Sequence, residues 1–238
     1  MNLVALQTNI DKDFGKNLTN IIKLIKTCKD SDLILASELA LTGYSYNNFI
    51  KAAQFSKHAI NRLLEESLNK KIAITMIIEE DGNYFNRFFL FSNKKIVYTQ
   101  DKYKLFELGN ETKYFSNKKN DEQIQIYEIE EFKIATLICF ELRFTKYWDR
   151  LKGADIILVP AMWGKGRKEH YEALTKALAI ANQCFVIAAN SADESCCKGS
   201  AIINPFGEVI IDDSKEILSL EFNKLDIKKM RSYINVGI

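Results

Sequence analysis

The stretch TLICFELRF, residues 136–144, begins as a buried β-strand and ends in reactive side chains. Its first three residues are apolar or β-branched, which favours a strand inside a core. Cys139, Glu141 and Arg143 then place a thiol, a carboxylate and a guanidinium beyond the end of that strand. Functional side chains gather at the carboxyl ends of strands in layered α/β proteins. The stretch therefore predicts an α/β fold with a functional site at this strand end.

The rest of the chain alternates short apolar runs with amphipathic segments, as expected of a layered α/β protein. Buried strands are expected at 3–8, 32–36, 154–160 and 184–190, and helices at 14–30, 47–69, 145–153 and 168–183. Further strands, most of them in antiparallel hairpins, are expected at 71–80, 84–92, 96–100, 123–129, 132–139, 200–211 and 216–222. The polar segment 107–121 has few apolar residues, and we expect an ordered loop there.

The composition indicates one large globular domain over residues 1–238. The chain has only two prolines and no linker-like segment, and hydrophobic residues make up 47% of it, enough for a sizeable core. The formal net charge is only +2, which gives no electrostatic reason to expect a nucleic-acid partner. Lysine pairs such as Lys118–Lys119 are expected in solvated turns.

We expect a cytoplasmic protein without a membrane segment. The first residues lack the basic and apolar regions of a signal peptide, and no apolar run reaches the ~18 residues that a membrane helix needs. The five cysteines are irregularly spaced, which predicts free thiols in a reducing compartment. Cys196–Cys197 is interpreted as incidental, because metal and redox sites favour Cys-x-x-Cys spacing, and no metal site is expected.

Three residues that follow expected strands suit nucleophilic acyl transfer: Glu38, Lys102 and Cys139. A thiol with a pKa of ~8.5 needs a base or a nearby positive charge, and Glu38 is a candidate base. Lys102 and the backbone N–H of Phe140 are candidate donors to an oxyanion. Each residue alone also has an ordinary structural interpretation, as a solvated rim residue or a small core residue. Spacing alone does not show that they meet.

Three ordered segments resemble the signatures of the nitrilase superfamily of carbon–nitrogen hydrolases. They are LASELALTGY (35–44), DKYKLF (101–106) and LICFELRF (137–144). ANQCFVIAAN (181–190) and KGSAIINPFGEVI (198–210) are similar to segments further downstream in that family. The resemblance therefore spans nearly the whole chain, and five segments in order are more specific than any one motif.

The resemblance implies a fold, a mechanism and an assembly. It implies an α-β-β-α sandwich in which Glu38 is the general base, Lys102 stabilises the oxyanion and Cys139 is the nucleophile. Glu111, in the segment NETKYF, matches a second glutamate that orients the lysine and the substrate. The family needs no cofactor, and its members commonly pair by stacking through helices near the nucleophile, which implies a homodimer.

The sequence departs from the usual family pattern at several positions. Ala36-Ser37 stands before the glutamate in place of Phe-Pro, and Thr145 replaces a proline. Lys104 occupies a position that is often histidine, so it is a rival for the role of the catalytic lysine. Glu141 replaces the common aspartate, which keeps the charge and adds a methylene group. None of these changes removes a catalytic group.

Other residues have both a functional and a structural interpretation. His170 is the alternative base, in a Cys–His pair, although its place in the first turn of a helix predicts partial exposure. Arg143 suits either a substrate carboxylate or an ion pair with Glu141 or Asp149. Three further residues are expected to line a pocket or to pack in the core: Tyr44, Met162 and Trp163.

The expected substrate is a small linear amide, cleaved to a carboxylate and ammonia. The segments PAMW (160–163), 169–190 and 196–210 most resemble the ω-amidase branch, which acts on ω-amides of dicarboxylic or 2-oxo acids. An N-carbamoyl amine or amino-acid amidohydrolase is the alternative enzyme. A catalytically degenerate member that acts as a binding or scaffold subunit is the alternative from another class.

Overall fold

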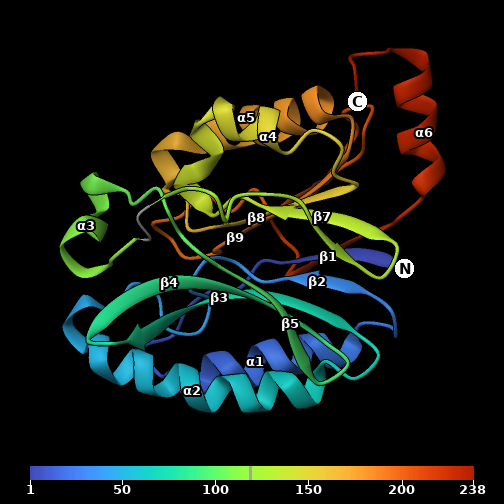
Figure 1. Cartoon of the computed structure of the whole chain (residues 1–238). Coiled ribbons are helices and arrows are strands. Elements are labelled where there is room, and N and C mark those ends of the chain that lie inside the picture. The colour runs from blue at the N-terminus through green and yellow to red at the C-terminus, as the bar shows by residue number, and fades with distance from the viewer. Residues whose placement is uncertain (118–119) are drawn as a thin grey trace.

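The computed structural model describes residues 1–117 and 120–238. Two six-stranded sheets have the strand orders β12-β1-β2-β3-β4-β5 and β11-β10-β9-β8-β7-β6. The sheets stack face to face, with α1 and α2 outside the first and α4 and α5 outside the second, so that four layers are seen edge-on in Figure 1. The α-β-β-α sandwich expected from the sequence is confirmed. No helix in the described ranges has the length and apolar character needed to cross a membrane.

The strands of the first sheet are β1 (Asn2–Leu6), β2 (Leu33–Leu35), β3 (Lys71–Glu80), β4 (Asn83–Ser92), β5 (Lys95–Asp101) and β12 (Ile217–Glu221). Those of the second are β6 (Tyr127–Ile129), β7 (Phe132–Thr136), β8 (Ile156–Ala161), β9 (Phe185–Asn190), β10 (Ala201–Ile203) and β11 (Val209–Ile211). The α-helices are α1 (Phe14–Thr27), α2 (Phe49–Glu66), α3 (Glu111–Tyr114), α4 (Thr145–Arg150), α5 (Lys168–Asn182) and α6 (Lys224–Tyr233). Short 3₁₀ helices span Tyr46–Asn48, Glu107–Gly109, Cys139–Arg143 and Lys165–Arg167.

Alternation along β1 shows how the sequence builds these layers. Leu3 and Ala5 belong to the core between the two sheets, whereas Val4 and Leu6 belong to the cluster under α1 and α2. Successive side chains of a strand point to opposite faces, so a strand between two apolar layers must be apolar throughout. This is why the continuous apolar runs in the sequence correctly predicted buried strands.

Parallel strands at the centre of each sheet bring functional positions together. β1, β2 and β3 are mutually parallel in the first sheet, as are β7, β8 and β9 in the second. The backbone N–H of Glu38, just past β2, donates to the carbonyl oxygen of Ala161 at the end of β8 over 3.1 Å. The carboxyl ends of these two central strands therefore meet across the sandwich.

Two expected strands are shorter than the sequence suggested. The strand predicted at 123–129 is limited to Tyr127–Ile129, because the Gln123 amide bonds the Asp101 backbone, with its Oε1 accepting from N (3.0 Å) and its Nε2 donating to O (2.7 Å). The strand predicted at 132–139 ends at Thr136, because the chain turns into a 3₁₀ helix that begins at Cys139.

The polar segment 107–121 also differs from the loop that was expected. It contains the 3₁₀ helix Glu107–Gly109 and the short helix α3, which projects from one end of the sandwich in Figure 1. The turn expected at Lys118–Lys119 lies outside the described residues.

Candidate active site

Cys139 lies at a sharp turn just beyond β7. It is the first residue of the 3₁₀ helix and has a φ of +49°, in the left-handed region that costs energy for any residue with a side chain. The preceding residue, Ile138, is still extended, so the chain reverses direction at the cysteine itself. The turn leaves Cys139 7% exposed at the wall of a pocket, between the fully buried Ile138 and the half-buried Phe140.

Lys102 is a fully buried ammonium group held between two carboxylates. It follows β5, and its Nζ lies 2.7 Å from Glu38 Oε1 and 2.7 Å from Glu111 Oε1. Burial alone lowers the pKa of Lys102, but the charges of Glu38 and Glu111 outweigh it and raise the pKa above its ordinary value. Lys102 therefore keeps its positive charge although it is fully buried.

Glu38 uses only one of its two carboxylate oxygens in the described structure. Oε1 accepts from Lys102 Nζ and, over 2.8 Å, from Asn86 Nδ2. Oε2 is buried and accepts a hydrogen bond from none of the described residues. A buried carboxylate oxygen without a donor is unfavourable, and such groups are rare outside functional sites. This oxygen is available to take a proton.

Glu111 holds the opposite side of the lysine. Its Oε1 accepts from Lys102 and, over 2.6 Å, from the Tyr44 hydroxyl, and its Oε2 accepts from the Phe106 backbone N–H over 3.1 Å. Burial raises the pKa of Glu111, Lys102 opposes that effect and the charge of Glu38 adds to it. Glu111, which was expected to orient Lys102, does contact that lysine.

The electrostatic environment keeps the Cys139 thiol protonated at neutral pH. Burial raises its pKa well above the ordinary value and Glu38 raises it further, while Lys102 and the Met162 backbone N–H act in the opposite direction. A thiol in this state becomes a nucleophile only when a base removes its proton as the reaction proceeds. The unpartnered oxygen of Glu38 is the base that this environment offers.

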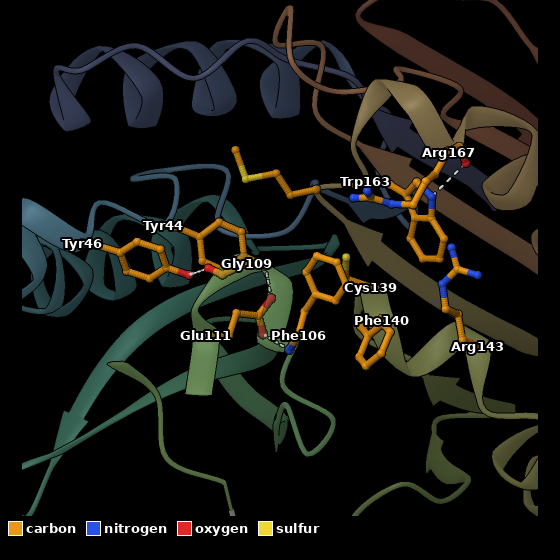
Figure 2. A pocket seen from close by; sticks show the side chains of 11 residues that line it. Tyr44, Tyr46, Phe106, Gly109, Glu111, Cys139, Phe140, Arg143, Trp163 and Arg167 are labelled. Atoms are coloured by element: carbon orange, nitrogen blue, oxygen red, sulfur yellow. Dashed lines mark hydrogen bonds between the residues drawn. The ribbon is translucent and has the colours of Figure 1, made fainter. Parts of the chain in front are cut away.

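A pocket of about 170 Å³ opens beside the thiol. Figure 2 shows tyrosines and Glu111 on one side of it, Cys139 and Phe140 near the middle, and Trp163 with two arginines on the other side. Its walls are formed by Tyr44, Tyr46, Phe106, Gly109, Glu111, Cys139, Phe140, Arg143, Met162, Trp163 and Arg167. The residues expected from the sequence to surround the substrate all lie here, whereas Glu38 and Lys102 are fully buried behind the wall.

Arg143 and Arg167 bring two positive charges to the pocket. The guanidinium of Arg143 lies 4.7 Å from the centre of the Trp163 ring, and that of Arg167 lies 5.4 Å from the centre of the Phe106 ring. Burial and the charge of Arg167 both lower the pKa of Arg143. Neither arginine forms an ion pair with a carboxylate in the described part of the chain. Two guanidinium groups without carboxylate partners have the chemistry to bind an anion.

The structure separates the alternatives that the sequence left open. Lys104 Nζ stacks over the rings of Tyr103 and Phe144, at 4.9 and 5.1 Å, so it does not join the buried carboxylates. His170, the alternative base, contacts Arg143: its Nδ1 lies 3.1 Å from a guanidinium nitrogen of that residue.

An ion pair between Arg143 and Glu141 or Asp149, one of the two interpretations that the sequence left open, is not formed in the described structure. Glu141 accepts hydrogen bonds from backbone amides, and Asp149 pairs with Lys152 over 2.9 Å.

Cys196 and Cys197, which are adjacent in the sequence, are free thiols. The Cys197 backbone N–H donates to the Trp163 carbonyl oxygen over 2.8 Å.

Sequence reasoning missed Asn86 and Arg167. Asn86 interrupts the apolar run of β4, and that interruption was the available signal for a buried polar role. Arg167 lies in the basic run GKGRK, which is typical of an exposed loop.

Within residues 1–117 and 120–238, no three His, Cys, Asp or Glu side chains gather as metal ligands.

Comparison with known proteins identifies the family. The family model for carbon–nitrogen hydrolases matches residues 3–235, and the chain belongs to this family. It is 28% identical over 244 residues to a 2-oxoglutaramate amidase of Bacillus subtilis (strain 168), covering 95% of this chain and 93% of that protein. It is 28% identical over 208 residues to omega-amidase YafV of Escherichia coli (strain K12), covering 83% and 78% respectively.

Solved structures share the fold at lower sequence identity. A CN-hydrolase superfamily protein from Xanthomonas campestris, with an arsenic adduct in its active site, superposes with a TM-score of 0.86 at 20% identity, covering 98% of this chain and 94% of that one. Nit3 of Saccharomyces cerevisiae, a member of branch 10 of the nitrilase superfamily, superposes with a TM-score of 0.84 at 18% identity, covering 100% and 95%. The chain is a carbon–nitrogen hydrolase of the amidase type.

Replacing Lys102 should destabilise the protein in a pH-dependent way. Lys102→Met leaves two buried carboxylates without their cation, which should lower the free energy of unfolding by about 3–5 kcal/mol near neutral pH. Lys102 is the charge that lowers the pKa of Glu111, so its loss should raise that pKa further above the unfolded value, and stability should be lost as the pH rises and partly regained in acid. Urea unfolding across the pH range tests this, with Lys104→Met as the control. Equal stability of the two variants would contradict the account.

Replacing Glu38 should make the thiol more acidic and yet less effective. Because the charge of Glu38 raises the pKa of Cys139, Glu38→Gln should lower that pKa, while kcat falls about 10²-fold through loss of the base. The pH dependence of Cys139 alkylation by iodoacetamide, followed by mass spectrometry, measures the first effect. The exposed Glu122→Gln is the control. An unchanged or higher thiol pKa in Glu38→Gln would exclude this electrostatic coupling.

Proposed function

We propose that this carbon–nitrogen hydrolase cleaves a small linear ω-amide of a dicarboxylic or 2-oxo acid to a carboxylate and ammonia. Glu38, Lys102 and Cys139 form its catalytic triad. One observation carries the proposal: Cys139 and two guanidinium groups without carboxylate partners, among the described residues, line the same pocket of about 170 Å³. A pocket of this size suits a short substrate, with an anionic group at one end and the scissile bond at the other.

Acylation begins with proton transfer from the Cys139 thiol to the free Oε2 of Glu38. The sulfur forms a bond to the amide carbon, and the carbonyl electrons move to the oxygen. Lys102 has three N–H groups, of which two bond carboxylates and the third makes a long contact of 3.4 Å with the Tyr44 hydroxyl. In this proposal the third N–H exchanges that contact for the oxyanion, which the Phe140 backbone N–H also binds. The intermediate collapses with cleavage of the C–N bond, and the departing nitrogen takes the proton from Glu38 to leave as ammonia.

Deacylation repeats these steps with water. Glu38 removes a proton from the water molecule, whose oxygen attacks the carbonyl carbon of the Cys139 thioester. The second intermediate has the same two oxyanion donors, and it collapses by breaking the C–S bond. The thiolate recovers its proton from Glu38, and the acid product leaves. One carboxylate therefore serves as base and acid in both halves of the reaction.

The substrate carboxylate lies against Arg143 and Arg167 in this proposal. A guanidinium binds a carboxylate through two parallel hydrogen bonds, which fixes orientation as well as affinity. The rings of Tyr46, Phe106 and Trp163 line the same pocket and suit a short methylene chain. Similarity to a 2-oxoglutaramate amidase and to an omega-amidase supports this substrate class.

We also propose that the enzyme is a homodimer that acts in the cytoplasm. Ile180 on α5 and Val209 and Ile211 on β11 are exposed, and Val209 and Ile211 line a groove that also carries Lys176 and Glu172. A two-fold interface uses the same patch on both subunits, and an apolar strip that carries both a lysine and a glutamate suits such pairing. Sedimentation should therefore give a dimer for the wild type and a monomer for Ile211→Asp. The five free thiols favour a reducing compartment.

Removing an arginine should selectively impair acidic substrates. Charge-assisted hydrogen bonds contribute about 1.5–3 kcal/mol, so Arg143→Ala and Arg167→Ala should each lower kcat/KM for 2-oxoglutaramate by about 10- to 100-fold. Hydrolysis of butyramide, which has no carboxylate, should be slow and nearly unchanged. Ammonia release with both substrates measures the preference.

Arg150→Ala removes an arginine that binds Asp121 at the surface, away from the pocket, and should leave both rates as they are. If the wild-type enzyme prefers butyramide, or acts only on N-carbamoyl compounds, the ω-amidase assignment fails. If it hydrolyses no amide at all, the scaffold alternative is the better interpretation.

A further inference from the structure

Glu141 is a fully buried carboxylate to which the reaction described above gives no role. It lies two residues after Cys139 on the same 3₁₀ helix. Its Oε2 accepts a hydrogen bond from the Ile138 backbone N–H over 2.8 Å. Its Oε1 accepts from the backbone N–H groups of Tyr103, over 2.7 Å, and Lys104, over 3.3 Å. All three donors are main-chain groups, so the contacts depend on where the backbone lies.

These three amides belong to two different segments of the active site. Ile138 directly precedes Cys139, and Tyr103 and Lys104 directly follow Lys102. The two segments come from different sheets, because β5 belongs to the first and β7 to the second. The left-handed φ of Cys139 is unfavourable, and such a conformation persists only where surrounding contacts enforce it. One carboxylate thus bridges the turn of the cysteine and the segment of the lysine.

We infer that Glu141 is a positioning residue that holds the Cys139 turn against the backbone beside Lys102. This inference rests on the proposed amidase reaction, in which the lysine must face the oxygen of a carbonyl carbon bonded to the sulfur. A displacement of about 1 Å between reacting groups can lower a rate about 10²-fold. Glu141 acts through the backbone and touches neither substrate nor reacting atoms.

The bridge requires an ionised carboxylate. Three N–H donors converge on Glu141, and glutamine offers only one acceptor oxygen, so its NH₂ group would face an N–H group. Burial raises the pKa of Glu141 to about 7, and hydrogen bonds from Ile138 and Tyr103 oppose this rise. Three titratable side chains interact with Glu141 through their charge: Lys102, Tyr98 and Tyr147.

Activity and stability should respond to Glu141 ionisation in opposite directions. As the pH falls through about 7, the carboxylate gains a proton and the bridge weakens, so kcat falls. Because the folded pKa lies above the ordinary 4.5, this group favours the folded state most in acid, and its contribution is lost as the pH rises through about 7. A merely structural role would make activity follow stability.

Steady-state kinetics of Glu141→Gln and Glu141→Asp test the inference. With 2-oxoglutaramate at about pH 8, Glu141→Gln should lose about 10²-fold in kcat per folded molecule while KM stays within about twofold. Glu141→Asp keeps the charge and should recover most of the loss. The exposed Glu128→Gln is the matched control and should behave as the wild type. Wild-type kcat in Glu141→Gln, or equal losses in the Gln and Asp variants, would overturn the inference.

Hydrogen exchange of the wild-type protein provides a test that needs neither a variant nor a substrate. The amides of Ile138, Tyr103 and Lys104 should be protected at about pH 8 and should lose protection together at about pH 6, after correction for intrinsic rates. Unprotected amides at the higher pH would overturn the inference even if Glu141→Gln fails to fold. A wild-type protein that shows this protection but hydrolyses no amide would refute the proposed function alone.

Discussion

The structure of the site depends on one interaction, the burial of the Lys102 ammonium group between Glu38 and Glu111. Removing an ammonium ion from water costs on the order of several kcal/mol, and only close opposite charges with good geometry offset that cost. Here two carboxylate oxygens lie 2.7 Å from the same nitrogen. The three groups follow β2, follow β5 and begin α3, so the interaction forms only when these segments meet at one end of the sandwich.

The same arrangement places negative charge beside the thiol and positive charge at the opposite wall of the pocket. Two carboxylates share one buried cation, and they leave a carboxylate oxygen of Glu38 without a donor in the described structure. Burial and this excess negative charge both raise the pKa of Cys139, so in the proposed reaction the thiol is activated when Glu38 accepts its proton. Arg143 and Arg167 bring positive charge to the pocket wall. This distribution of charge suits the proposed substrate, which is anionic at one end and neutral at the other.

The sequence predicted the layers and the order of the strands well, because both follow from local patterns, although the strands predicted at 123–129 and 132–139 are shorter than expected. Continuous apolar runs such as 154–160 are typical of strands buried on both faces. Three motifs identified the residues that follow strand ends, including Lys102 after the largely exposed β5. The arrangement of those residues is not local: Lys102 and Glu38 are 64 positions apart. Asn86 and Arg167 were missed because a lone amide in a strand and an arginine in a basic loop have no distinctive pattern. The left-handed turn at Cys139 likewise follows from tertiary contacts.

The most direct test of this account is mass spectrometry of the enzyme quenched in acid during turnover of 2-oxoglutaramate. The account predicts a covalent acyl adduct on Cys139 alone, formed together with a first equivalent of ammonia, and its absence from Glu38→Gln and Cys139→Ala quenched at the same time. Ammonia release with no adduct in any quenched sample, or an adduct on another cysteine, would contradict the central claim that Cys139 is the nucleophile activated by the buried Glu38–Lys102–Glu111 cluster.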